Sequence, residues 1–147
     1  MVTLIPGYIY SILAAVIVGT IVVSSCTLML ASLKSEALSQ QLANVDEYVA
    51  AQSLNLVNHV TENGQNATQI LNLPTEIGNR AYWISINNDG SNAWVESGFG
   101  ATAIGSRPQI YIPADVAASG TFVSGWGSAT LHCVYQNQTV TLTLTSE

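Results

Sequence analysis

Residues 1–33 read MVTLIPGYIYSILAAVIVGTIVVSSCTLMLASL and contain no charged side chain. As an α-helix this segment is ~50 Å long, whereas the hydrocarbon core of a bilayer is ~30 Å thick. The apolar run is also longer than the core of a secretory signal peptide, and no basic residue comes before it. A helix that is apolar on every face has to be buried on every face, in lipid or among other helices. Residues 1–33 therefore predict either a membrane span or a helix buried in a helical assembly.

The helical pattern continues beyond the apolar run. Residues 34–63 contain no Pro or Gly, and apolar residues recur at helical spacing at Leu38, Leu42, Val45, Val49 and Leu56. Polar side chains are expected on the rest of the helix surface, at Gln40, Gln41, Asp46, Glu47 and Gln52. Asn63-Gly64 is a suitable C-cap, because both residues tolerate the left-handed conformation. We predict one helix of about 60 residues, from near Thr3 or Gly7 to about Asn63, whose second half has one apolar face.

After Gly64 the apolar residues alternate with period two, as in β-strands. Strands are expected at 82–86, 93–95, 109–112, 121–124, 129–135 and 139–145, with a turn at 87–90. The predicted fold is α+β: an N-terminal helix over 1–63 (1–33 apolar, 34–63 amphipathic) and a small antiparallel β-sandwich or barrel head over 64–147. The amphipathic stripe of 34–63 is expected to serve as an extra wall for this thin core.

The final strand has the clearest pattern of the head. Val140, Leu142 and Leu144 alternate strictly with a set of threonines, Thr139, Thr141, Thr143 and Thr145. Since successive side chains of a strand point to opposite faces, we expect the three aliphatic side chains to point into the core.

Charge and cysteine content exclude several classes of protein. The net charge is −6 with only three basic residues, so the chain has almost nothing with which to neutralise nucleic-acid phosphates. Two cysteines, Cys26 and Cys133, cannot form the disulfide framework of a small secreted domain, and an inert apolar role is expected for both.

The sequence shows no arrangement of residues typical of an active site. His59 and Glu62 make two ligands at most, which is too few for a metal site, and His132 faces away from its neighbour Cys133 on a strand. We therefore expect no catalytic activity, no metal and no cofactor. Trp83, Trp94 and Trp126 are expected either to complete the core or to form a contact surface.

Two tripeptides match the acceptor pattern for N-glycosylation. They are Asn66-Ala67-Thr68, just after the helix, and Asn137-Gln138-Thr139, at a predicted hairpin turn. Asn66 and Asn137 are therefore candidate modification sites, provided that the chain is exported in an organism that glycosylates its surface proteins.

A long apolar N-terminal helix followed by a small β domain resembles an archaeal type IV pilin, and archaellins share the same helix plan. The run LNLPTEIGNRAYWI at 71–84 is similar to the strand entry of such heads, and Ile112-Pro113, Gly120 and Gly125 continue the pattern. Signal peptides of this class end in a cleavage site made of a basic and a small residue, and no such site precedes Met1. We therefore expect either a mature or trimmed chain or unusual processing. The early helix lacks the glutamate of bacterial pilins, which favours the archaeal branch.

The resemblance implies a structural subunit of an extracellular adhesion filament, inserted in the membrane before assembly. Its partners would be many identical subunits, a pilus assembly machinery and a signal-processing peptidase. The positions expected to pack in the filament core are Ile12, Val16, Gly19, Val23 and Leu30. Two alternatives remain open: a monomeric, membrane-anchored surface protein whose β domain binds a ligand, and an archaellin of a motility filament, for which 147 residues is short.

Overall fold

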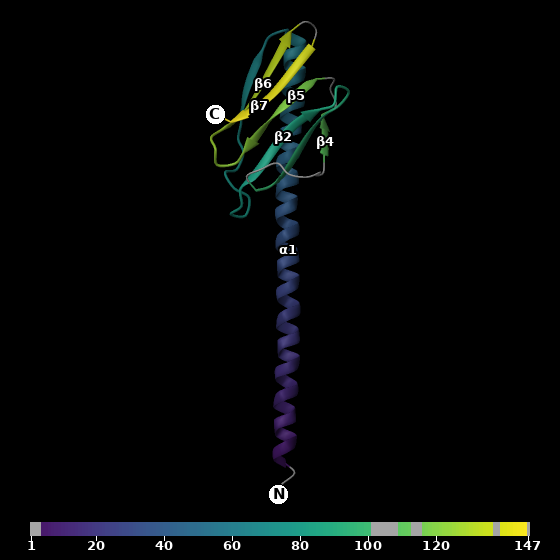
Figure 1. The fold of residues 1–147 in the computed structure, drawn as a ribbon, viewed down its shortest axis with the longest axis vertical. Coiled ribbons are helices and arrows are strands. Elements are labelled where there is room, and N and C mark those ends of the chain that lie inside the picture. Colours follow the sequence, from purple (N-terminus) through teal and green to yellow (C-terminus); the bar gives the residue numbers. More distant parts are fainter. Residues whose placement is uncertain (1–3, 101–108, 113–115, 137–138, 147) are drawn as a thin grey trace. The chain divides into compact units, whose positions relative to one another are not determined.

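The computed structural model describes residues 4–100, 109–112, 116–136 and 139–146. One helix, α1 (Leu4–Asn63), precedes all the strands, so the predicted continuous helix is confirmed (Figure 1). The seven strands are β1 (Ala67–Leu71), β2 (Tyr82–Asn88), β3 (Ala93–Phe99), β4 (Gln109–Ile112), β5 (Ala117–Val123), β6 (Ala129–Gln136) and β7 (Thr139–Ser146).

The end of α1 is set by a glycine cap. Gly64 has a φ of 65°, in the left-handed region, and its N–H donates to the Val60 carbonyl over 2.9 Å. This is the bond that closes an αL cap, in which glycine avoids the steric cost of a Cβ. The helix therefore ends at the residue that the sequence predicts.

The chain forms two compact units, a helical unit of Met1–Ser39 and a head unit of Gln40–Glu147. The second half of α1 thus belongs to the head unit together with all seven strands. Its sheet-facing side buries six apolar residues, and the stripe predicted from the sequence is among the buried or half-buried positions. The buried apolar residues of this segment are Leu42, Val49, Ala50, Leu56, Val57 and Val60.

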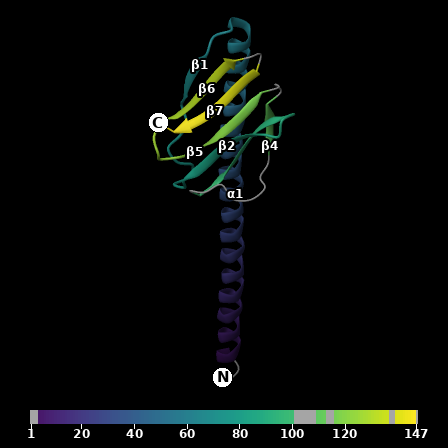
Figure 2. The ribbon, with the colours of Figure 1, turned by 45° about the horizontal axis from the view of Figure 1, so that its top comes forward.

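The head unit has two layers: one sheet, in the order β1-β6-β7-β5-β2-β3-β4, and the helix segment of 40–63 on one face of it (Figure 2). All pairs are antiparallel except β5 with β7, which are parallel. The α+β class is confirmed, but the antiparallel sandwich or barrel is wrong in detail. The helix stripe covers the apolar face of the sheet, so the strands do not need a second sheet to bury it.

The parallel pair depends on a glycine at a close approach. Gly120 of β5 lies opposite Leu144 of β7 and has a φ of 123°. A Cβ at this position would lie 2.1 Å from the Leu144 carbonyl oxygen, so any side chain would push the two strands apart.

The register of β7 agrees with the sequence prediction. Val140, Leu142 and Leu144 are buried, whereas Thr139 and Thr141 are exposed. Leu142 pairs with buried Cys133 of β6, and its side chain is fully buried. The aliphatic half of β7 is therefore part of the core between sheet and helix.

This register predicts the effect of two neighbouring substitutions. Leu142→Ala should lower the free energy of unfolding of the head by about 2–5 kcal/mol, because it removes buried methyl groups and leaves a cavity. Thr141→Ala should change it by less than about 0.5 kcal/mol, since the side chain is exposed. Urea unfolding of the full chain in detergent, followed by tryptophan fluorescence, measures both. Equal losses at the two positions would contradict the register.

Candidate functional site

The helical unit presents an uncovered apolar surface. Every described side chain from Gly7 to Ala37 is exposed. The helix has a window of mean hydropathy 2.4 in which no residue is buried, so it is long and apolar enough to cross a membrane. An apolar surface of this size is rarely left in contact with water, and it marks a site of interaction with lipid or with protein.

The hydroxyl groups on this surface bond to their own helix. Each Ser or Thr side chain from residue 7 to residue 33 donates to a backbone carbonyl three or four residues earlier, over 2.8–3.0 Å. The six are Ser11, Thr20, Ser24, Ser25, Thr27 and Ser32. Because these donors are already satisfied, they can enter an apolar environment without the cost of an unpaired polar group.

The predicted filament-core residues share one side of this surface. At 3.6 residues per turn, Ile12, Val16, Gly19, Val23 and Leu30 lie within an arc of about 60°. The four larger side chains are 49–67% exposed, and apart from Gly19 itself, its two chain neighbours and the nearby backbone of the same helix, no described atom lies within 4 Å of a Cβ built on Gly19. A glycine in the middle of an apolar stripe lets a second helix approach closely. Their role in packing stays a prediction.

One of the two candidate glycosylation sites lies in the described part of the chain. Asn66 is exposed, and its Oδ1 accepts a hydrogen bond from the Tyr135 N–H over 3.0 Å. Thr68, the third residue of this tripeptide, has its hydroxyl 3.0 Å from Nδ1 of His132. Asn137 lies outside the described residues.

The head unit contains a buried carboxylate, Asp46, at a position where the sequence predicts a surface residue. Asp46 was expected on the surface, but it is 6% exposed and faces the sheet. Its Oδ2 accepts a hydrogen bond from the Ser97 hydroxyl of β3 over 2.6 Å, and its Oδ1 is buried without a partner. Burial raises the pKa of Asp46 from 3.8 to about 6, although the Ser97 bond opposes the shift. The acid therefore titrates near neutrality in the folded head.

The other polar candidates have structural surroundings. Burial raises the pKa of the Cys133 thiol, which keeps it protonated and a poor nucleophile. His59 lies on the exposed side of α1, with Nδ1 3.1 Å from the Asn63 amide. In the described ranges no three His, Cys, Asp or Glu side chains gather in a way that could hold a metal ion.

The three tryptophans have different environments. Trp83 is 1% exposed and completes the core. Trp94 is half-buried and its ring centroid lies 6.4 Å from that of Tyr111. Trp126 is 74% exposed. Of the two roles expected for these residues, a contact surface remains open only for the last two.

Comparison with known proteins gives no relative: no family model, no curated protein and no solved structure matches this chain. The function is therefore inferred from the residues described above.

The buried Asp46 predicts an unusual pH dependence of stability. Its pKa is higher in the folded state than in the unfolded chain, so ionisation costs the folded state about 3 kcal/mol. Protonated Asp46 carries no such cost. Its contribution to the free energy of unfolding is therefore fully present below pH 3.8 and is lost as the pH rises through about 6. Asp46→Asn cannot ionise and should lack this loss.

The measurement is urea unfolding of both proteins at a series of pH values, in the same detergent. All other titrating groups are common to the two proteins, so the difference between their profiles isolates Asp46. Parallel profiles between pH ~4 and ~6 would contradict the assignment.

Proposed function

We propose that this chain is a structural subunit of an extracellular type IV-like adhesion filament, polymerising through its N-terminal helix. The observation that carries the proposal is the helical unit itself. Residues 1–33 are uncharged, every described side chain from residue 7 to residue 37 is exposed, and the Ser and Thr hydroxyls of residues 7–33 bond to their own helix. A surface of this kind is stable only when it is covered. In a filament, copies of the same helix provide the cover.

Lipid is the cover that we propose for the subunit before assembly. Tyr8 and Tyr10 are exposed near the start of the helix, and Lys34 is the first charged residue after them. The stretch between Tyr10 and Lys34 is ~36 Å long, close to the thickness of a bilayer core with tyrosine and lysine at its two interfaces. The same surface would serve a monomeric membrane-anchored protein, so assembly has to be measured directly.

The exposed asparagine fits the surface of such a filament. The hydrogen bond from Tyr135 occupies Oδ1 of Asn66 and leaves Nδ2, the atom that a glycan would modify, outside the bond. Glycosylation of Asn66 is therefore compatible with the folded head, and we include it in the proposal.

The test of glycosylation is the mass of the chain purified from its native host. Asn66→Gln should lower that mass by one glycan, because glutamine is not an acceptor in this pattern. Asn58→Gln, at another exposed asparagine outside any acceptor tripeptide, should leave the glycan mass unchanged. A chain whose mass equals that of the bare polypeptide would contradict this part of the proposal.

The test of polymerisation is a charge placed within the apolar surface. Val18 is 60% exposed in the single chain and would be buried in a filament. Val18→Asp would then bury an unpaired charge, at a cost of several kcal/mol per subunit, and filaments should be lost. Val18→Thr is the matched control, because its hydroxyl can bond back to the helix as Ser11 and Thr27 do.

Filaments are counted by electron microscopy after the detergent is removed, and Asn58→Asp controls for the added charge on the exposed side of α1. The proposal requires filaments from the wild type, Val18→Thr and Asn58→Asp, and none from Val18→Asp. A wild-type chain that returns to liposomes as a monomer would instead identify the membrane-anchored alternative. Normal filaments from Val18→Asp would place the polymer contact elsewhere.

A further inference from the structure

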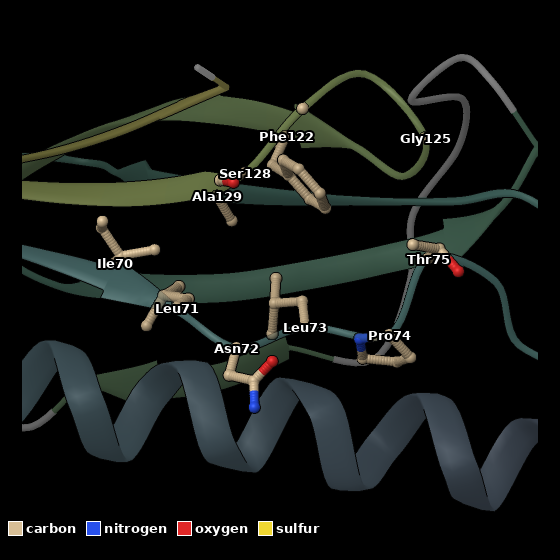
Figure 3. Close-up of a pocket in the computed structure, with 11 residues that line it drawn as sticks. Ile70, Leu71, Asn72, Leu73, Pro74, Thr75, Phe122, Gly125, Ser128 and Ala129 are labelled. Carbon is tan, nitrogen blue, oxygen red and sulfur yellow. The ribbon is translucent and has the colours of Figure 1, made fainter.

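The head unit contains a hollow of about 400 Å³ at the end of the sheet where β1 and β5 finish and β6 begins (Figure 3). Its walls are mixed, with apolar side chains beside the polar groups of Asn72, Thr75 and Ser128, and Leu73 and Phe122 point toward one another across it. None of the described residues that line it is charged, although the chain carries a net charge of −6. Its volume lies in the range of natural binding pockets, and it is large enough to accept an aromatic ring.

A tryptophan stands on the rim of this hollow. Gly125 and Gly127 line the hollow, and Trp126 lies between them in the turn from β5 to β6. The indole is 74% exposed, which means that it does not fill the hollow of its own chain. Ile70, also a lining residue, is 68% exposed at the edge strand β1. A large apolar side chain therefore projects beside a hollow whose described lining residues are uncharged.

We propose that two copies of the head pair about a two-fold axis, each seating its Trp126 indole in the hollow of the other. A two-fold contact brings the same patch of both copies together, so a projection beside its own receptor site satisfies both partners at once. Burying an exposed tryptophan gives a large apolar contribution at a small cost in side-chain entropy. The described lining residues carry no charge, so they add no repulsion between two acidic chains at this point.

The pairing is separate from polymerisation through α1. The Trp126 contact would pair free subunits before assembly, because it uses the head unit and leaves residues 1–33 available for the polymer contact. It does not depend on the function proposed above, since the patch belongs to the head unit alone.

The first experiment measures the mass of the full chain in detergent by light scattering, over a series of protein concentrations. The wild type should pass from monomer to dimer, and Trp126→Ala should weaken the dimer by at least about 30-fold, as for a central tryptophan of an interface. Tyr111→Ala is the matched control, because it truncates another exposed aromatic residue, on the far edge strand β4. It should leave the dimer unchanged.

The second experiment separates the projection from the hollow. Ile70→Asp places a charge at the mouth of the hollow, at an exposed position, and should abolish the dimer of that variant. A mixture of Trp126→Ala, which keeps the hollow, and Ile70→Asp, which keeps the indole, should form mixed dimers through one of the two contacts. Energy transfer between differently labelled chains detects them.

The outcomes are distinct. Monomeric wild type at all concentrations, or a dimer that survives Trp126→Ala, would overturn the proposal. So would equal loss of the dimer in Tyr111→Ala, or the absence of mixed dimers from two variants that each melt like the wild type. All variants have the same α1, so association of the apolar helices in detergent would affect all of them equally.

Discussion

The packing of one helical stripe against one face of the sheet is the interaction on which the head depends. Seven strands form a single layer, and the helix segment of 40–63 is the layer that covers their apolar face. Val49 and Val60 of the helix and Leu142 and Leu144 of the sheet are nearly or fully inaccessible to solvent. A domain this small has little free energy to spare, so loss of the helical cover would leave the sheet without a core.

The parts of the fold that were predictable from sequence are those encoded by local periodicity. The helix end follows from Asn63-Gly64, and the strict alternation in β7 fixes which side chains face the core. The turn before β3 is also local, because the Asp89 carboxylate accepts hydrogen bonds from the N–H groups of Ser91 and Asn92. Each of these signals lies within a few residues, where chain geometry limits the alternatives.

Features that depend on distant partners were not predictable. Asp46 occupies a position of the buried stripe, but its charge pointed to the surface, and its partner is Ser97 on β3. The short strand β1 is not evident from the sequence because it is defined by pairing with β6, and the hollow beside it forms where β1 and β5 end and β6 begins. No pattern within 64–147 distinguishes a parallel β5–β7 pair from an antiparallel one.

Charge is distributed unevenly along the chain, and this distribution suits both the apolar helix and the head. All twelve charges lie after residue 33, so the apolar half of α1 can be covered by any apolar environment without burying an ion. The outer face of β7 uses threonine hydroxyls rather than charges to stay hydrated. On the proposed filament, where identical heads crowd together, every charge on the head would repel its own copy on the neighbours. A surface kept in water by neutral hydroxyl groups avoids that repulsion, which accounts for a charged fraction of only 8% in a protein with so much polar surface to present.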